Sequence, residues 1–310
     1  MRVMQIVQTP QGIALQPSER PVPKPGPGEL LIRVRAAGVT PTELEWQPTT
    51  HNPDGSPRKH AIPAHEFSGD VCARGDGIED VEVGQPVYGM NDWYQEGALA
   101  DFCIAPDTSV ANKPKSLSYE QAATVPIGAL TAWQALTTHG HLRSGERVLI
   151  HGGAGGVGLF AVQFAKHLGA HVIATAAAAA IPLVKKLGAD EAIDYRGARF
   201  DLHLRNVDLV LDTVGGETLE RSWNVLGPTG RIVTVVSGIP SDAPQRTKGA
   251  FFIVQPDGKR LAELAELLDA GKLQTFVKNA ASLKEAELAY THSLPPGLAY
   301  GKTVICMRKA

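Results

Sequence analysis

Three glycines at a fixed spacing are the first residues of this 310-residue chain whose arrangement points to a chemistry. In RVLIHGGAGGVGLFAVQFAKHLG, Gly153, Gly155 and Gly158 stand in G-x-G-x-x-G register between a strand-like and a helix-like run. Such glycines allow a tight turn, a close approach of the backbone to a pyrophosphate, and close packing of the helix, in that order. The N–H groups at the start of the helix then attract the phosphates. The motif in this context predicts a dinucleotide-binding loop made of Gly153, Ala154, Gly155, Gly156 and Val157.

A run of alanines follows at the place where such a fold distinguishes its cofactors. In HVIATAAAAAIPLVKK, residues 171–186, every position from 174 to 180 except Thr175 is alanine. NAD-preferring folds place an acid about 20 residues after the glycine motif to hold the ribose hydroxyl group. No acid occurs here before Asp190. The sequence therefore disfavours NAD.

The elements around these residues change character along the chain. Short alternating apolar runs separated by Gly/Pro turns fill residues 1–118, which is typical of a β-rich domain. Strand-like Val/Ile/Leu runs then alternate with helix-like segments, as in a doubly wound parallel sheet. Beyond residue 275 the strand-like character returns. We therefore predict an α/β protein in which a β-rich domain of residues 1–118 and 275–310 encloses a nucleotide-binding domain of residues 119–274.

Composition excludes several classes of partner. The 30 basic and 32 acidic residues give a net charge of -2, so there is no electrostatic case for a nucleic acid or an anionic membrane. No apolar run approaches the ~20 residues of a membrane span, and the first residues do not read as a signal peptide. The three widely spaced cysteines suggest neither a disulfide framework nor a cysteine zinc site. We expect a cytoplasmic protein without a membrane partner.

Five stretches together resemble the medium-chain dehydrogenase/reductase superfamily, and within it the zinc-independent quinone oxidoreductase-like branch. They are VPIGALTAW, VLIHGGAGGVG, LGADEAIDY, LDTVGG and GKTVI. The resemblance covers nearly the whole chain. It implies a GroES-like catalytic domain, a Rossmann domain, a cofactor bound in the cleft between them, a small-molecule substrate and commonly a homodimer.

The zinc-containing members of that superfamily raise the question of a metal. They carry a cysteine where this chain has Thr40, a His-Glu pair at His65 and Glu66, and a further ligand near Ile127. Only the His-Glu pair is present here, whereas a catalytic zinc needs three protein ligands. We therefore expect no metal, and we interpret His65 and Glu66 as structural residues.

Without a metal, the reaction should be one in which hydride transfer itself creates a stabilised anion. Reduction of a conjugated carbonyl compound (an enone or enal) or of a quinone meets this condition, and the protein then mainly orients the reactants and stabilises the oxygen. The resemblance places Thr40 in the substrate pocket, where relatives often carry asparagine. Trp46, Asn91 and Trp93 are candidates to line that pocket. Tyr94 is our hypothesis for the group that donates a hydrogen bond or proton to the carbonyl. The alternative is that these aromatic residues cap the core of the β-rich domain.

The resemblance also assigns cofactor contacts beyond the glycine loop. They are Thr131, Thr175, Ala176, Ala177, Ala180, Tyr195, Val214, Val236, Ser237, Phe252, Ile253 and Val254.

The alanine run leaves two interpretations open. NADP-preferring relatives carry polar residues near Ala177 and Ala180 that grip the 2′-phosphate. The run is either a small-residue turn packed under the adenine, or polar residues at these two positions have been replaced by alanine. Tyr195 and nearby basic side chains remain to hold the phosphate. NADPH is therefore predicted as the cofactor, with reduced discrimination against NADH.

Two other functions stay open from the sequence. One is a zinc-independent carbonyl or imine reductase, which only the substrate pocket would distinguish. The other is a non-catalytic structural protein of quinone reductase-like fold, against which the intact glycine loop and Thr131 argue.

Overall fold

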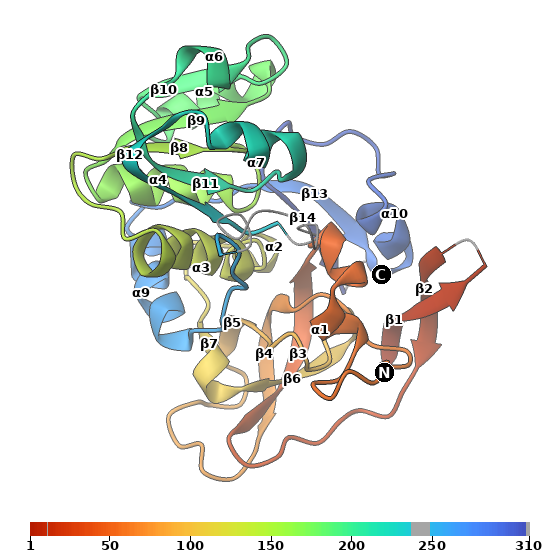
Figure 1. Ribbon diagram of the computed structural model, residues 1–310. Coiled ribbons are helices and arrows are strands. Elements are labelled where there is room, and N and C mark those ends of the chain that lie inside the picture. Colours follow the sequence, from red (N-terminus) through yellow and green to blue (C-terminus); the bar gives the residue numbers. More distant parts are fainter. Residues whose placement is uncertain (11, 237–248, 308–310) are drawn as a thin grey trace. The chain divides into compact units, whose positions relative to one another are not determined.

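The computed structural model describes residues 1–10, 12–236 and 249–307. The chain forms two compact units (Figure 1). The first holds Met1–Ile127, Pro256–Leu298 and the residues from Lys302 on, and the second holds Gly128–Gln255 and Ala299–Gly301.

The first unit is built on β-sheets. A hairpin of β1 and β2 forms a two-stranded sheet, and a larger sheet has the strand order β13-β14-β3-β4-β5-β7, with β6 pairing with β3. Among the described strand pairs of the larger sheet, β13 and β14 run parallel and the others are antiparallel. The strands are β1 (Arg2–Thr9), β2 (Gly12–Glu19), β3 (Glu29–Gly38), β4 (Glu66–Arg74), β5 (Pro86–Met90), β6 (Phe102–Pro106), β7 (Val110–Asn112), β13 (Val277–Ser282) and β14 (Lys302–Cys306).

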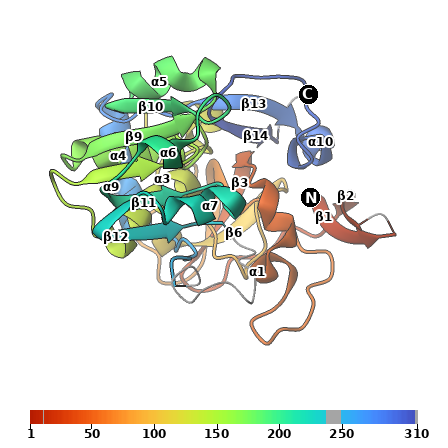
Figure 2. The same cartoon turned by 45° about the horizontal axis from the view of Figure 1, so that its top comes forward.

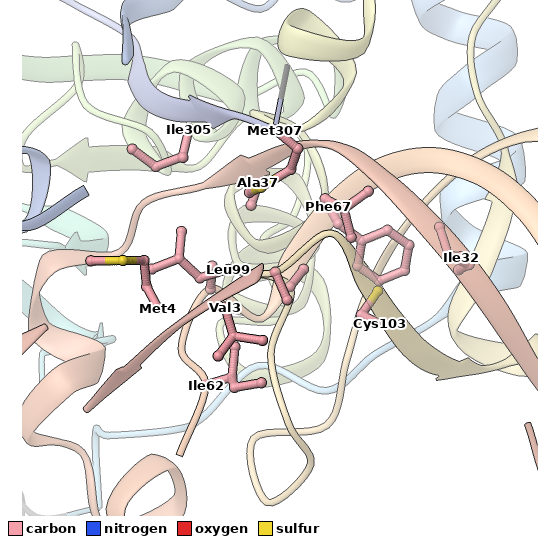
Figure 3. Close-up of a cluster of buried hydrophobic side chains, with 14 of the residues drawn as sticks. Val3, Met4, Ile32, Ala37, Ile62, Phe67, Leu99, Cys103, Ile305 and Met307 are labelled. Carbon is pink, nitrogen blue, oxygen red and sulfur yellow. The ribbon is translucent and has the colours of Figure 1, made fainter. Parts of the chain in front are cut away.

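Among the described residues of this unit, the helices are short except for one of 12 residues. They are η1 (Pro41–Glu45), α1 (Gln47–Thr50), η2 (Asp107–Ser109), α2 (Tyr119–Ala122), α9 (Gly258–Asp269), η5 (Leu283–Glu285) and α10 (Ala286–Tyr290). Apolar side chains from the N-terminal hairpin, from β3 and β4, and from the C-terminal strand meet in one core (Figure 3). This core draws residues from both ends of the chain, since Val3 and Ile305 belong to the same cluster.

The second unit is a five-stranded parallel sheet of order β10-β9-β8-β11-β12 (Figure 2). Its strands are β8 (Arg147–Ile150), β9 (His171–Ala176), β10 (Glu191–Asp194), β11 (Val207–Asp212) and β12 (Leu226–Thr234). Its helices are α3 (Pro126–Gln134), η3 (Ala135–His139), α4 (Gly158–His167), η4 (Ala178–Ala180), α5 (Ile181–Lys186), α6 (Phe200–His203) and α7 (Gly216–Ser222). The central strands are buried along nearly their whole length, which explains their unbroken apolar sequences. The predicted α/β class and doubly wound parallel sheet are confirmed.

The units are bounded differently from the predicted domains 1–118 with 275–310 and 119–274. The amphipathic helix α9, predicted to belong to the nucleotide-binding domain, packs on β7 in the first unit. The hydroxyl of Tyr88 donates to the carbonyl of Leu261 at 2.6 Å. A side chain at Gly258 would lie 2.5 Å from the carbonyl oxygen of Val110, so the start of the helix is in close contact with that strand. None of the described helices is long and apolar enough to cross a membrane.

Candidate functional site

The glycine loop joins the end of β8 to the start of α4. The residue that takes the left-handed conformation is Gly152, with φ of 67°, and a side chain there would lie 2.5 Å from the Thr213 hydroxyl. The sequence motif predicts this role for Gly153, and that prediction is wrong. Gly153 instead permits close approach to the Ala174 methyl group, 2.9 Å from where its own Cβ would be. Gly158 has the predicted packing role, because its Cβ would lie 2.1 Å from the Gly152 carbonyl oxygen.

The loop offers backbone donors to an anion. The N–H groups of Ala154, Gly156 and Val157 have no hydrogen-bond partner among the described residues. At Gly155 an added Cβ would meet only the Gly152 carbonyl oxygen, at 3.3 Å, so that side of the loop is open. The ten-residue helix α4 begins directly afterwards and adds its positive end. These residues fit the pyrophosphate of a dinucleotide.

Helix α3 brings Thr131 towards this loop. A Cβ at Gly128 would lie 2.3 Å from the carbonyl oxygen of Gly156, so the helix and the loop touch at that point. Thr131 is one turn further along the same helix face and is buried. The predicted cofactor residue therefore lies on the helix face that meets the loop.

Thr175 holds the glycine turn from the neighbouring strand β9. Its hydroxyl oxygen accepts the N–H of Gly152 at 3.2 Å, and its carbonyl accepts the N–H of Gly153 at 2.8 Å. The hydroxyl also lies 3.2 Å from Nδ1 of His151. Thr175 is buried, so it supports the loop from the interior of the protein.

The alanine run forms the end of β9 and the turn into α5. Ala176 is the last strand residue, Ala177 is extended, and Pro182 stands in the first turn of the helix as predicted. Ala180 is fully buried, whereas Ala178 and Ala179 are exposed. Of the two positions predicted to bear a lost polar residue, only Ala177 is partly accessible.

Tyr195 lies beside this run. Its N–H donates to the Ala176 carbonyl at 3.3 Å, and the residue is 54% exposed. The guanidinium of Arg196 lies 5.6 Å from the centre of the ring. A flat exposed ring with a cation above it is a suitable surface for a phosphorylated ribose.

The remaining predicted cofactor residues follow β11 and β12. Val214 is exposed, and Val236 is packed beside Gly215, where an added Cβ would be 2.7 Å from a Val236 methyl group. The two loops therefore lie side by side. Phe252 is stacked on His139 at 4.1 Å and is buried, and Ile253 and Val254 follow it outside any helix or strand. Ser237 lies outside the described residues.

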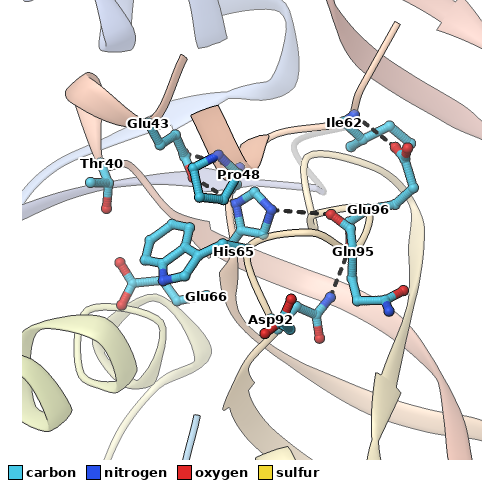
Figure 4. A network of polar contacts seen from close by, with 12 residues as sticks. Thr40, Glu43, Pro48, Ile62, His65, Glu66, Asp92, Gln95 and Glu96 are labelled. Atoms are coloured by element: carbon cyan, nitrogen blue, oxygen red, sulfur yellow. Dashed lines mark hydrogen bonds and ion pairs between the residues drawn. The ribbon is translucent and has the colours of Figure 1, made fainter. Parts of the chain in front are cut away.

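In the first unit, His65 is the centre of a buried polar network (Figure 4). His65 and Glu43 are both fully buried, and Nδ1 of His65 is 2.9 Å from Oε2 of Glu43. The other ring nitrogen lies 3.2 Å from the Gln95 carbonyl. Oε1 of Glu43 accepts the N–H of Ala64 at 3.0 Å and the hydroxyl of Tyr290. Burial and the charge of Glu43 raise the pKa of Tyr290, which therefore acts as a donor.

A second buried pair lies next to this network. The ammonium of Lys302 is paired with Oε1 of Glu66, and Oε2 accepts the N–H of Ile127 at 2.9 Å. Lys302 also donates to the hydroxyl oxygen of Thr40 at 3.3 Å. Burial lowers the pKa of Lys302 to about 7, against the opposing effect of the Glu43 carboxylate. The carboxylate of Glu66 occupies the space that a side chain at Gly38 would fill.

The predicted substrate residues fall into two groups. Trp93 is only 3% exposed and packs against Trp46, with ring centres 4.6 Å apart, and against His65 at 4.9 Å. Asn91 is fully buried and donates from Nδ2 to the Glu96 carbonyl at 3.0 Å. Tyr94, the next residue after Trp93, is 40% exposed. The packing of Trp93 supports the alternative that it caps the core.

Two family models match the chain. One is the alcohol dehydrogenase GroES-like domain, over residues 26–115, and the other the zinc-binding dehydrogenase model, over residues 187–305. The NAD(P)H oxidoreductase RTN4IP1 of Danio rerio mitochondria is 31% identical, over 90% of this chain and 84% of that protein. The chloroplast quinone-oxidoreductase QR1 of Triphysaria versicolor is 32% identical, over 93% and 92%. A 2-methylene-furan-3-one reductase of Solanum lycopersicum is 31% identical, over 89% and 71%.

Solved structures agree with these relatives. The quinone oxidoreductase of Coxiella burnetii superposes with a TM-score of 0.84 at 29% identity, and covers 99% of both chains. A mycobacterial protein complexed with NADPH gives a TM-score of 0.81 at 29% identity, over 99% of this chain and 100% of that one. The chain belongs to the medium-chain dehydrogenase/reductase superfamily, in its quinone oxidoreductase-like branch. It is an NAD(P)H-dependent oxidoreductase of the quinone oxidoreductase type.

The residues of this oxidoreductase do not fit a catalytic zinc. Both ring nitrogens of His65 already face Glu43 and Gln95, and both oxygens of Glu66 are engaged by Lys302 and Ile127. Within the described part of the chain, no three His, Cys, Asp or Glu side chains are grouped as a metal site. The contacts support the structural interpretation of His65 and Glu66, and metal-free catalysis stays a prediction.

Sequence reasoning missed three residues of this oxidoreductase that the structure places at the networks. Glu43 and Tyr290 are separated by 247 residues, and Lys302 begins the last strand. None of them belongs to a motif with fixed spacing. Glu43 lies within the irregular segment 40–66, whose length alone was a weak sign of a functional region.

Proposed function

We propose that this oxidoreductase uses NADPH to reduce conjugated carbonyl compounds or quinones. The observation that carries the proposal is the engagement of His65 and Glu66, at the positions of zinc ligands in related enzymes, by protein partners of their own. Without a Lewis acid there, the substrate must itself delocalise the charge that hydride transfer creates. The names of two relatives, a quinone-oxidoreductase and a 2-methylene-furan-3-one reductase, support this substrate class.

The chain's own residues have two tasks in this proposal. The bound dinucleotide supplies the hydride. The N–H groups of Ala154, Gly156 and Val157 hold its pyrophosphate, and the Thr40 hydroxyl hydrogen-bonds the substrate oxygen. Because Lys302 already donates to the Thr40 oxygen, the proton of that hydroxyl is available to donate onward. Tyr94 stays a second candidate donor, since it is exposed.

Unpaired buried polar atoms in the first unit bear on the substrate contact. Nε1 of Trp46 and Oδ1 of Asn91 have no hydrogen-bond partner among the described residues. Buried polar atoms are normally paired, so each requires a partner from solvent or from a ligand. A conjugated carbonyl compound offers an acceptor for the indole N–H. Trp46 therefore remains a proposed substrate contact. Asn91 stays a candidate to line the pocket, but its free oxygen needs a donor that a carbonyl group does not supply, and Trp93 has a packing role.

For the cofactor we propose NADPH with modest discrimination. The 171–186 stretch lacks an acid that would bind the ribose hydroxyl groups of NADH, and Tyr195 and Arg196 lie beside the run. The small side chains at 176–180 supply no hydrogen bond to a 2′-phosphate. The proposed homodimer and cytoplasmic location rest on the resemblance and the composition alone.

Steady-state kinetics test the proposal. NADPH and NADH would each be assayed with a small enone, a quinone, the matching saturated ketone and a cyclic imine. We expect turnover of the enone or quinone, a higher kcat/KM for NADPH by less than about tenfold, and slow reduction of the ketone and imine. Faster reduction of the ketone or imine would favour the carbonyl or imine reductase. Absence of cofactor oxidation with every substrate would favour the non-catalytic alternative.

A further inference from the structure

His151 is a buried titratable residue that the proposed chemistry does not use. It is the last residue before the Gly152 turn, only 1% exposed, with its ring against Phe200 at 4.6 Å. Its two ring nitrogens face hydroxyl groups on different elements. Nδ1 lies 3.2 Å from the Thr175 hydroxyl on β9, and Nε2 lies 2.9 Å from the Ser222 hydroxyl on α7.

With a neutral His151 ring, the donors and acceptors from Gly152 through Thr175, His151 and Ser222 fit together in one arrangement of hydrogen bonds. The Thr175 oxygen accepts the N–H of Gly152, and when the proton of a neutral ring is on Nε2, Nδ1 accepts the Thr175 hydroxyl. At the other end, the Ser222 hydroxyl donates to the Thr218 carbonyl at 2.7 Å and therefore accepts from Nε2. His151 thus carries its proton on Nε2 and is neutral.

The charges around the ring agree with this assignment. Burial lowers the pKa of His151 to about 4, and the opposing charge comes from Asp212 on β11. That carboxylate is engaged elsewhere, since it accepts the Thr234 hydroxyl at 2.7 Å and the N–H of Gly215 at 3.0 Å. The described partners of the ring on β9, α7 and α6 are two hydroxyl groups and an aromatic ring. The neutral form is therefore stable over the usual working range of pH.

We propose that His151 is a positioning residue for the dinucleotide loop. Its Nδ1 orients the Thr175 hydroxyl so that the hydroxyl oxygen holds the N–H of Gly152, and its bond to Ser222 anchors the ring on α7. The carbonyl of His151 accepts the Thr213 hydroxyl at 2.8 Å, which holds the same turn from its other side. The left-handed turn at Gly152 in turn sets the direction of the free N–H groups of Ala154, Gly156 and Val157. The effect belongs to dinucleotide binding and does not depend on which substrate is reduced.

Two substitutions, each of which keeps one of the two hydrogen-bonding positions of the imidazole, separate this role from simple packing. In His151→Asn, the side-chain oxygen lies near the place of Nδ1 and keeps an acceptor for Thr175, but the bond to Ser222 is lost. In His151→Gln, the side-chain nitrogen lies near the place of Nε2 and keeps the bond to Ser222, but Thr175 loses its acceptor. Both variants shorten or reshape the same buried side chain, so each serves as the control for the other.

The measurements are the dissociation constant of NADPH, by titration of the whole enzyme without substrate, and amide hydrogen exchange of residues 151–157 without cofactor. We expect the Asn variant to bind NADPH within about threefold of the original, and the Gln variant to bind roughly tenfold more weakly, the size of one hydrogen bond. Exchange of the loop should accelerate only in the Gln variant. Equal affinities, or weaker binding by the Asn variant, would overturn the proposal, whatever the melting temperatures.

A double-mutant cycle with Thr175 provides the second test. Thr175→Val removes the hydroxyl at constant shape and should weaken NADPH binding about as much as His151→Gln. Combining the two should cause no further loss, because both break the same contact. Thr175→Ser should restore the affinity. Additive losses, or no rescue by serine, would show that the two residues act independently and would contradict the proposal.

Discussion

Each of the two units buries a histidine, and the two histidines have partners of different kinds. His65 in the first unit faces a carboxylate and a carbonyl oxygen, both of which accept protons. Both ring nitrogens of His65 therefore lie against acceptor oxygens, one of them on the buried Glu43 carboxylate. His151 in the second unit faces two hydroxyl groups, and a single ring proton, on Nε2, is enough for both of its hydrogen bonds. The same side chain is thus part of an ionic network in one unit and of a neutral chain in the other.

This difference predicts different consequences of mutation. In the first unit, buried charged groups are paired with groups of opposite charge. Removal of one partner leaves the other charge unpaired and lowers the free energy of unfolding by about 3–5 kcal/mol. In the second unit, removal of a neutral partner leaves one unpaired polar group, at a cost of about 1–3 kcal/mol. The first network should mainly control the stability of its unit. The second should mainly control the order of the cofactor loop.

The largest effect should come from breaking the Glu66–Lys302 pair. Glu66→Gln keeps an acceptor for the N–H of Ile127 but removes the charge beside the buried ammonium, so we expect a loss of about 3–5 kcal/mol in the free energy of unfolding. Lys302→Met should cost a similar amount. The double variant should recover most of it, since no charge remains unpaired. Urea unfolding measures all three, and a single variant within about 1 kcal/mol of the original would refute a compensating role.

The next effect is a dependence of stability on pH from His151. Its pKa is about 4 in the folded protein against 6.5 for the free side chain, so between these values the unfolded chain binds a proton that the folded chain does not. Stability should therefore fall as the pH drops through this window, by about 3 kcal/mol at its lower end. The His151→Asn variant cannot take up this proton and should show a flatter profile in urea unfolding between pH 7 and 4.5. Equal slopes for the two proteins would contradict the neutral assignment.

A smaller effect should separate the two networks directly. Tyr290→Phe removes one donor from Glu43 and should lower the free energy of unfolding by about 1–2 kcal/mol. The dissociation constant of NADPH should not change, because this network lies in the first unit. Thermal melting and cofactor titration of the same preparation test both statements. A clear loss of cofactor affinity would show that the two networks are coupled.

The smallest effect should come from the alanine run. Ala177→Ser adds a hydroxyl at the partly accessible position and should tighten NADPH a few-fold without changing NADH. Ala180→Asn introduces a larger polar side chain at a fully buried position and should lower the melting temperature instead. Michaelis constants for both cofactors provide the measurement. Equal tightening of NADH by the serine would remove this position from 2′-phosphate recognition.

Part of the candidate site followed from sequence because its signals are local. The glycine motif, the apolar strands around it and the first-turn Pro182 each depend on a few consecutive residues, and the structure has them where they were expected. The motif did not distinguish Gly152 from Gly153, because a pair of adjacent glycines fits the turn in either register. Only the backbone angle identifies Gly152 as the residue in the left-handed region.

Other features were beyond the sequence because distant segments decide them. The apolar stripe of α9 fits any apolar surface, and only packing on β7 assigns the helix to the first unit. Trp93 and Tyr94 are neighbours in the chain, yet one is buried and the other exposed, because consecutive side chains of a loop point to different sides.

The sequence by itself determined the α/β class, the parallel sheet and the position of the dinucleotide loop, since periodicity and glycine spacing are properties of short segments. The tertiary structure decided the hydrogen-bond partners and the role of each buried histidine. The Tyr290 hydroxyl donates to the Glu43 carboxylate although 247 residues separate the two in the sequence, and Ser222 contacts His151 across 71 residues. The state of a buried ionisable group depends on the partners that folding brings to it, and no short segment contains them.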